Sequence, residues 1–237
     1  SLPRFDLRLV APSALALILG FLVIYFLSDG LRLYFVLRAI GAVIKVREIF
    51  PLIFINILFS NVTPLATGGG FAQVWYLQRR GVPVGASAAA TTIRTILAML
   101  AIFIAALLFQ LLLPGAAPAG LARVSLQSLS GFILVYLAGF LIVLCRPLWI
   151  AGLLGRMLAL GARMNLIGAA RRDRWTAAVR RENAEFSASF GRFVAGSRLY
   201  VVAAVLATLV FLLTLFAFPA LLLEILDYDV DWLRVIG

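Results

Sequence analysis

The sequence predicts an all-α fold, a polytopic transmembrane helical bundle with a re-entrant broken-helix hairpin. Hydrophobic residues make up 64% of the 237 residues and charged residues only 13%. Soluble domains contain roughly half apolar and about a quarter charged residues. The apolar residues also form runs long enough to cross a bilayer, which takes about 20 residues. Between two of these runs lies a polar, glycine-rich stretch that contains a proline.

Four segments are predicted to span the membrane as helices: residues 9–27 (continuing as helix to residue 40), 86–113, 126–144 and 200–223. Residues 49–59 are apolar but too short to span, since a helix rises only about 1.5 Å per residue. A second short apolar helix is expected around residues 71–77. The whole chain, 1–237, is interpreted as one transmembrane domain.

The basic residues predict the orientation of the bundle. Most arginines lie in loops between apolar runs, as the positive-inside rule requires, so the net charge of +11 does not indicate a nucleic-acid partner. The basic loop at about 147–198 is predicted to be cytoplasmic. Lys45 and Arg79 flank the two short apolar segments and should lie on that same side. Residues 49–77 must therefore enter and leave by one face, which predicts the re-entrant hairpin.

Within the basic loop, residues 171–193 mix aromatic residues with arginines. This pattern fits an amphipathic helix on the membrane surface, and it fits a solvated helical linker equally well. The chain starts without Met, and its first span would place the N-terminus outside. We therefore expect a fragment of a longer protein.

The residue types present exclude several kinds of chemistry. The chain has no His and one Cys, Cys145, so neither an internal disulfide nor a Cys/His metal site is expected. No Lys-Ser/Thr pair follows the glycine triplet, so it is not a nucleotide-binding loop. No cofactor is expected. Glu48 is the carboxylate nearest the polar stretch, and without His we consider an enzyme acting on a membrane lipid the weakest hypothesis.

The polar stretch is the predicted functional site. Pro64 and the glycines should end one helix and start another. Broken backbone within a membrane is tolerated only against protein or a wet cavity, and transporters use such breaks to bind substrates. The first turn of the second half-helix would offer N–H groups and a partial positive charge to an anion such as a lipid phosphate. The candidate headgroup-binding residues here are Asn61, Thr63, Pro64, Thr67, Gly68, Gly69, Gly70 and Gln73. Close helix packing is the alternative role for the glycines.

Arg94 completes the predicted site. It lies among threonines near the cytoplasmic start of the 86–113 span, and a charge inside a span is a functional candidate. It could bind a lipid phosphate. The alternative is that its side chain snorkels to the nearby interface.

Residues 61–77, with the sequence NVTPLATGGGFAQVWYL, resemble the signature of the lysylphosphatidylglycerol synthase transmembrane-region family of flippase-like membrane proteins. Related features of the family are expected at the positions of the helix at 31–38, the turn at 79–82 and Arg94. The resemblance covers roughly residues 9–113. The chain departs from it at Gly70, where a polar residue such as Gln is expected. The family's later Pro/Gly-rich element is not visible, which agrees with a fragment.

The resemblance implies a multi-pass protein of the inner membrane that moves an anionic or aminoacylated phospholipid, such as lysyl-phosphatidylglycerol, between leaflets. Some members carry a soluble aminoacyltransferase domain, which is not seen in this chain, so synthesis is not implied. Such a domain or partner, and a homo-oligomer, both stay open. A non-transporting accessory or structural subunit is the alternative function.

Overall fold

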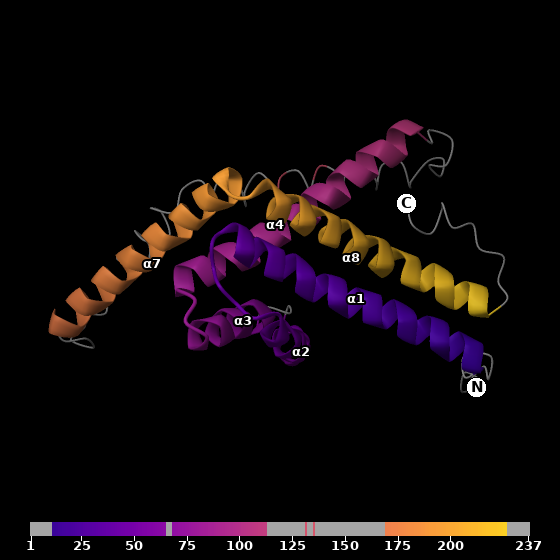
Figure 1. The fold of residues 1–237 in the computed structure, drawn as a ribbon, viewed down its shortest axis with the longest axis horizontal. Coiled ribbons are helices and arrows are strands. Elements are labelled where there is room, and N and C mark those ends of the chain that lie inside the picture. Colours follow the sequence, from indigo (N-terminus) through magenta and orange to yellow (C-terminus); the bar gives the residue numbers. More distant parts are fainter. Residues whose placement is uncertain (1–10, 65–67, 113–130, 132–134, 136–168, 227–237) are drawn as a thin grey trace.

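The computed structural model describes residues 11–64, 68–112, 131, 135 and 169–226, and the secondary structure of this part of the chain is helical, with short turns between the helices. Figure 1 shows the arrangement of its helices. Their bounds are α1 Pro12–Ala39, α2 Ile49–Val62, α3 Gly68–Arg79, α4 Val84–Leu112, α7 Ala169–Ala195 and α8 Arg198–Ile225, with a short 3-10 helix, η2, at Val46–Glu48. The predicted fold class is confirmed.

Three of these helices, α1, α4 and α8, are long and apolar enough to cross a membrane. They correspond to the predicted spans 9–27 with its extension to 40, 86–113 and 200–223. The predicted span 126–144 lies outside the described residues. Helices α2 and α3 occupy the two short apolar segments, and each is too short to cross alone at about 1.5 Å per residue.

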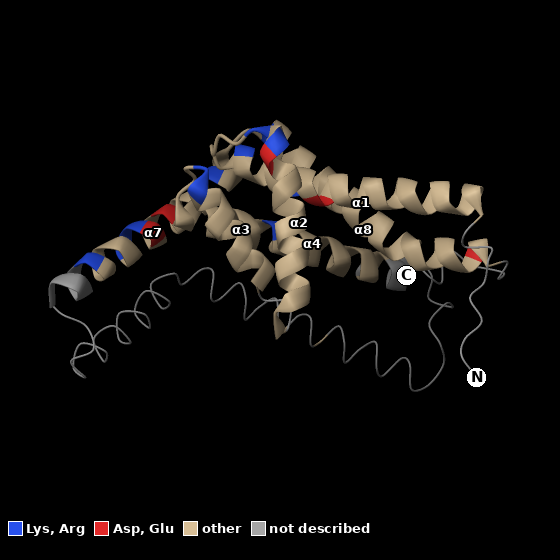
Figure 2. Ribbon diagram, turned by 90° about the horizontal axis from the view of Figure 1, so that it is seen from below, with Lys and Arg blue, Asp and Glu red and all other residues tan. Residues whose placement is uncertain are grey.

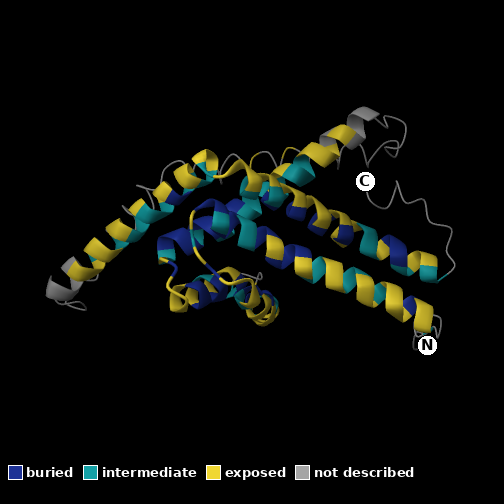
Figure 3. Cartoon of the chain, viewed as in Figure 1, coloured by how far each residue is buried: buried dark blue, intermediate teal, exposed yellow. Residues whose placement is uncertain are grey.

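Helices α1 and α8 lie side by side along most of their length (Figure 1). Small residues of α8 at the contact, Ala204 and Thr208, are fully buried, and the Thr208 hydroxyl donates to the Ala204 carbonyl at 2.7 Å. Small residues allow helices in membranes to approach closely. The outward faces carry exposed large apolar side chains such as Leu19 and Leu206, as expected of lipid-facing surfaces (Figure 3).

Basic residues gather at one end of the bundle. Figure 2 shows Lys and Arg at the C-terminal end of α1 and along α7, whereas the opposite ends of α1 and α8 have none among the described residues. Arg38 of α1 donates to the Tyr200 hydroxyl at 3.3 Å, and Arg80 pairs with Glu48 at 2.9 Å. This clustering agrees with the predicted positive-inside arrangement. Which side of a membrane this end faces stays a prediction.

Two glycines turn the chain at this basic end. Gly41 after α1 and Gly81 after α3 have φ values of +85° and +86°, which glycine adopts without strain. After α3, the N–H of Gly81 donates to Gln78 and that of Val82 to Leu77, the pattern of a Schellman motif. The motif ends α3 and directs the chain into α4 on the same side.

Helix α7 includes residues 171–193, so the helix predicted there is confirmed. It packs on the start of α4, where the Gly85 N–H donates to the Glu182 carboxylate at 2.9 Å. A carboxylate at a helix N-terminus satisfies a free N–H and opposes the positive end of the dipole. The Phe186 and Phe190 rings contact each other, with centroids 5.2 Å apart. Whether α7 rests on a membrane surface or is solvated stays open.

Candidate functional site

The predicted helix break lies between α2 and α3. Helix α2 ends at Val62, α3 begins at Gly68, and the two pack against each other as a hairpin (Figure 1). Pro64 lies in this connection and cannot donate a backbone hydrogen bond. Thr67, one of the predicted site residues, falls outside the described residues. The hairpin agrees with the prediction for residues 49–77, while its entry into a membrane stays a prediction.

Thr63 holds the two half-helices together. Its hydroxyl donates to the Phe59 carbonyl at 2.6 Å, at the end of α2. The same oxygen accepts the Gly68 N–H at 2.8 Å, at the start of α3. One of the N–H groups expected to face a lipid phosphate is therefore satisfied within the hairpin.

The three glycines differ in what surrounds them. A Cβ at Gly69 would collide with the Ser60 hydroxyl and the Asn56 side chain, and would lie 2.8 Å from the Asn56 carbonyl oxygen. A Cβ at Gly68 would lie 2.7 Å from the Thr63 hydroxyl oxygen. At Gly70 no described atom lies within 4 Å of an added Cβ. Gly68 and Gly69 therefore let α3 approach α2 closely, and Gly70 is exposed.

Gln73 is the most deeply buried of the predicted site residues. It is 0% exposed, and neither its amide oxygen nor its amide nitrogen has a hydrogen-bond partner among the described residues. An unsatisfied buried amide costs roughly 1–3 kcal/mol, so such a group calls for a ligand or water. By contrast, Asn61 and Pro64 are exposed. The hairpin thus presents an exposed tip and a buried polar group further along α3.

Arg94 is buried in a cluster of charges rather than extended to the surface. Its Nη1 lies 3.6 Å from an Asp29 carboxylate oxygen, and its side chain is 11% exposed. Arg32, one turn further along α1, holds the same oxygen through Nε at 3.0 Å and Nη2 at 2.7 Å. Asp29 and Arg32 were not among the predicted site residues. The signal was present in the sequence, as two opposite charges three positions apart inside the helix predicted to reach residue 40.

Both helices place this cluster far from the basic end. Asp29 precedes Arg38 by nine residues, which corresponds to about 14 Å along a helix. Arg94 follows Val84, the first residue of α4, by ten residues, which corresponds to about 15 Å. The hydrocarbon core of a bilayer is about 30 Å thick. With the basic end at one interface, the cluster would lie near the middle of the membrane.

Aromatic rings enclose the cluster on the side of α8. The Arg32 guanidinium lies over the Phe211 ring, 3.7 Å from its centroid. The Tyr25 ring contacts Phe211, with ring centroids 4.9 Å apart. A cation over a ring is stabilised more strongly where water is excluded. Helix α8 therefore covers the charges and holds Arg32 against Asp29.

The hairpin meets the charge cluster at Gly30. A Cβ on this residue would lie 2.6 Å from side-chain carbons of both Ile49 and Ile53. Glycine thus lets α2 approach α1 next to Asp29. The start of α2, the helix that leads to the break, therefore packs next to the buried charges.

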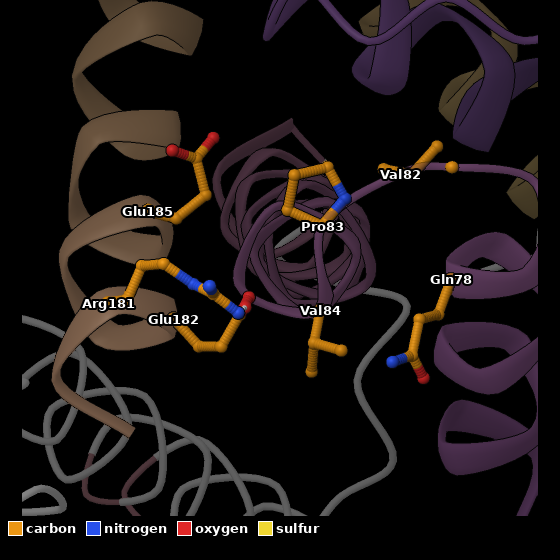
Figure 4. Close-up of a pocket in the computed structure, with 8 residues that line it drawn as sticks. Gln78, Val82, Pro83, Val84, Arg181, Glu182 and Glu185 are labelled. Atoms are coloured by element: carbon orange, nitrogen blue, oxygen red, sulfur yellow. Dashed lines mark hydrogen bonds and ion pairs between the residues drawn. The ribbon is translucent and has the colours of Figure 1, made fainter. Parts of the chain in front are cut away.

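A separate open groove of about 340 Å³ lies at the basic end, between α7 and the α3–α4 turn (Figure 4). Its lining includes Gln78, Pro83 and three charged residues of α7, Arg181, Glu182 and Glu185. Glu182, one of the lining residues, already accepts the Gly85 N–H. The groove contains none of the predicted site residues.

The family model of the lysylphosphatidylglycerol synthase TM region matches residues 1–237. The chain belongs to this family. The resemblance carried by residues 61–77 is thereby confirmed, and the protein is a membrane protein of the lysylphosphatidylglycerol synthase TM family. No curated protein and no solved structure matches the chain.

The glycines of this family member give a matched test of the hairpin. Gly69→Ala should lower the free energy of unfolding by about 1–3 kcal/mol, because its Cβ would collide with α2. Gly70→Ala should be neutral, since its Cβ meets open space. Thermal unfolding of the two purified variants in detergent compares them. Equal stability of both variants would contradict the close approach at Gly69.

Thr63 can be tested in the same way. Thr63→Val removes both hydrogen bonds of the hydroxyl and should cost about 1 kcal/mol, or roughly 2–4 °C in melting temperature. Thr63→Ser keeps the hydroxyl and should lie close to the wild-type value. A serine variant as unstable as the valine variant would show that the methyl group matters and the bridge does not.

Proposed function

We propose that this protein is a multi-pass lipid transporter of the flippase type, in the cytoplasmic (inner) membrane, that moves an anionic or aminoacylated phospholipid between leaflets. The single observation that carries the proposal is Arg94. It is a buried guanidinium in a membrane-length helix, and its Nη1 has no hydrogen-bond partner in the described part of the chain. A lipid phosphate is the anion that a membrane offers to such a group.

Guanidinium is suited to this role by its chemistry. It stays charged in proteins, and its planar array of N–H donors matches the oxygens of a phosphate. Buried charges in membrane spans are expensive to keep and usually mark the path of a substrate or ion. A bound phosphate would repay part of that cost by supplying both a counter-charge and hydrogen-bond acceptors.

The hairpin would provide the remainder of the headgroup site. Helix α2, which leads to the backbone break, packs on α1 at Gly30. The Gln73 amide has no hydrogen-bond partner among the described residues and could bind a headgroup hydroxyl or amine. Lipid tails could stay in the membrane along the exposed apolar faces of α1 and α8. In this proposal the polar headgroup crosses the membrane inside the protein, while the acyl chains stay in the lipid.

A non-transporting accessory subunit is the second candidate. The close approach of α3 to α2 at Gly68 and Gly69, and the Thr63 bridge, favour it because they account for much of the polar stretch by packing. They do not account for Arg94. Chemistry on a lipid is less well supported, since Asp29 and Glu48 are each paired with an arginine rather than placed as a base.

Reconstitution into liposomes tests the proposal. Wild-type protein should move a fluorescent phosphatidylglycerol or lysyl-phosphatidylglycerol between leaflets, measured by dithionite quenching. Arg94→Gln should lower that rate at least about tenfold, because removing one partner of a buried charge contact costs 2–5 kcal/mol. Arg180→Gln, an exposed arginine of α7, is the control and should keep the wild-type rate.

Two outcomes would count against the proposal, one against transport and one against the site. Wild-type protein that leaves the leaflet distribution unchanged would remove the proposed function itself. Full activity in Arg94→Gln would show that transport does not depend on Arg94, and would remove this residue from the proposed site.

A further inference from the structure

We infer that Asp29 determines which anion the buried site accepts, by setting its charge so that it matches one phosphodiester and rejects a phosphomonoester. This inference rests on the proposed function, because it assigns the ligand class of the same site. The residue acts through charge balance and not by contact with the ligand.

The two arginines do not bind the Asp29 carboxylate equally. Arg32 holds one carboxylate oxygen with two nitrogens, at 3.0 and 2.7 Å. Arg94 approaches the same oxygen only to 3.6 Å, beyond a normal hydrogen bond, and its buried Nη1 has no hydrogen-bond acceptor in the part of the chain that the structure describes. Asp29 and Arg32 therefore form the resident pair, and Arg94 is the group with binding capacity left.

The charges of the cluster do not cancel. Two guanidinium groups and one carboxylate leave a net charge of +1. All three side chains are about nine-tenths buried, with 9 to 11% exposed. Uncompensated charge in such surroundings costs several kcal/mol, so the site is most stable when one further negative charge enters.

This balance selects among lipid headgroups. A phosphodiester carries one negative charge and would bring the site to neutrality. A phosphomonoester carries about −1.5 to −2 near pH 7 and would leave a buried excess of negative charge. Phosphatidylglycerol should therefore bind in preference to phosphatidic acid, although the smaller headgroup of the latter fits more easily. Without Asp29 the site would carry +2, and the order should reverse.

Equilibrium binding to the purified chain tests this inference. The probes are phosphatidylglycerol and phosphatidic acid with the same acyl chains, in nanodiscs of phosphatidylcholine at pH 8, where the monoester is a dianion. Native mass spectrometry or lipid competition gives the ratio of the two affinities. The variants are Asp29→Asn, Arg32→Gln and the double variant of both.

Each variant has an expected result. The wild-type protein should prefer phosphatidylglycerol, and Asp29→Asn should shift the ratio toward phosphatidic acid by about tenfold or more. Arg32→Gln leaves no net charge and should lose binding of both lipids at least about tenfold. The double variant returns the net charge to +1 and should recover the wild-type preference, which a purely structural role of the pair would not produce.

The inference fails if the affinity ratio of Asp29→Asn equals that of the wild type, or if the folded double variant does not recover the preference. Should Asp29→Asn not fold, the comparison of Arg32→Gln with the double variant still decides, since charge balance requires binding to return. Binding is measured without transport. A wild type that binds lipids in the charge-matched order but never moves them would reject the proposed function alone.

Discussion

The rest of the described structure depends on one constraint, which is that three charges lie together inside helices long enough to cross a membrane. Neither arginine could stay there alone, because an isolated buried charge costs far more than a helix gains by packing. Asp29 and Arg32 neutralise each other within one turn of α1, and Arg94 of α4 shares the same carboxylate. The cluster therefore fixes the register between α1 and α4, while Phe211 of α8 covers it.

The packing around this cluster explains where small residues are needed. Gly30 follows Asp29 in α1 and lets α2 come close. The first helix of the hairpin therefore starts next to the buried charges. Gly69 then lets α3 lie against α2, and Thr63 joins their facing ends. A larger side chain at Gly30 would push α2 away from α1, and one at Gly69 would push α3 away from α2. The glycine-rich stretch therefore allows close packing of α3 on α2 as well as supplying free backbone groups.

Much of this arrangement could be predicted from the sequence, because hydropathy and helix breakers are local properties. The ends of α2 and α3 agree with the break expected at Pro64 and the glycines, and α7 agrees with the expected helix at 171–193. The orientation of Arg94 could not be predicted. Whether the Arg94 side chain extends to the interface or into the interior depends on the carboxylate of Asp29, which lies 65 positions earlier in the sequence. A local sequence pattern does not show that these two residues are close in space. The different roles of Gly69 and Gly70 depend likewise on how closely α2 approaches.

Helix α4 links the two charged regions of the molecule. At its N-terminus, Glu182 of α7 accepts the Gly85 N–H, and ten residues after Val84 the same helix carries Arg94. A helix transmits a shift or tilt along its axis because each turn is bonded to the next. The contact with α7 and the buried charge site therefore lie on one continuous helix, about 15 Å apart along its axis.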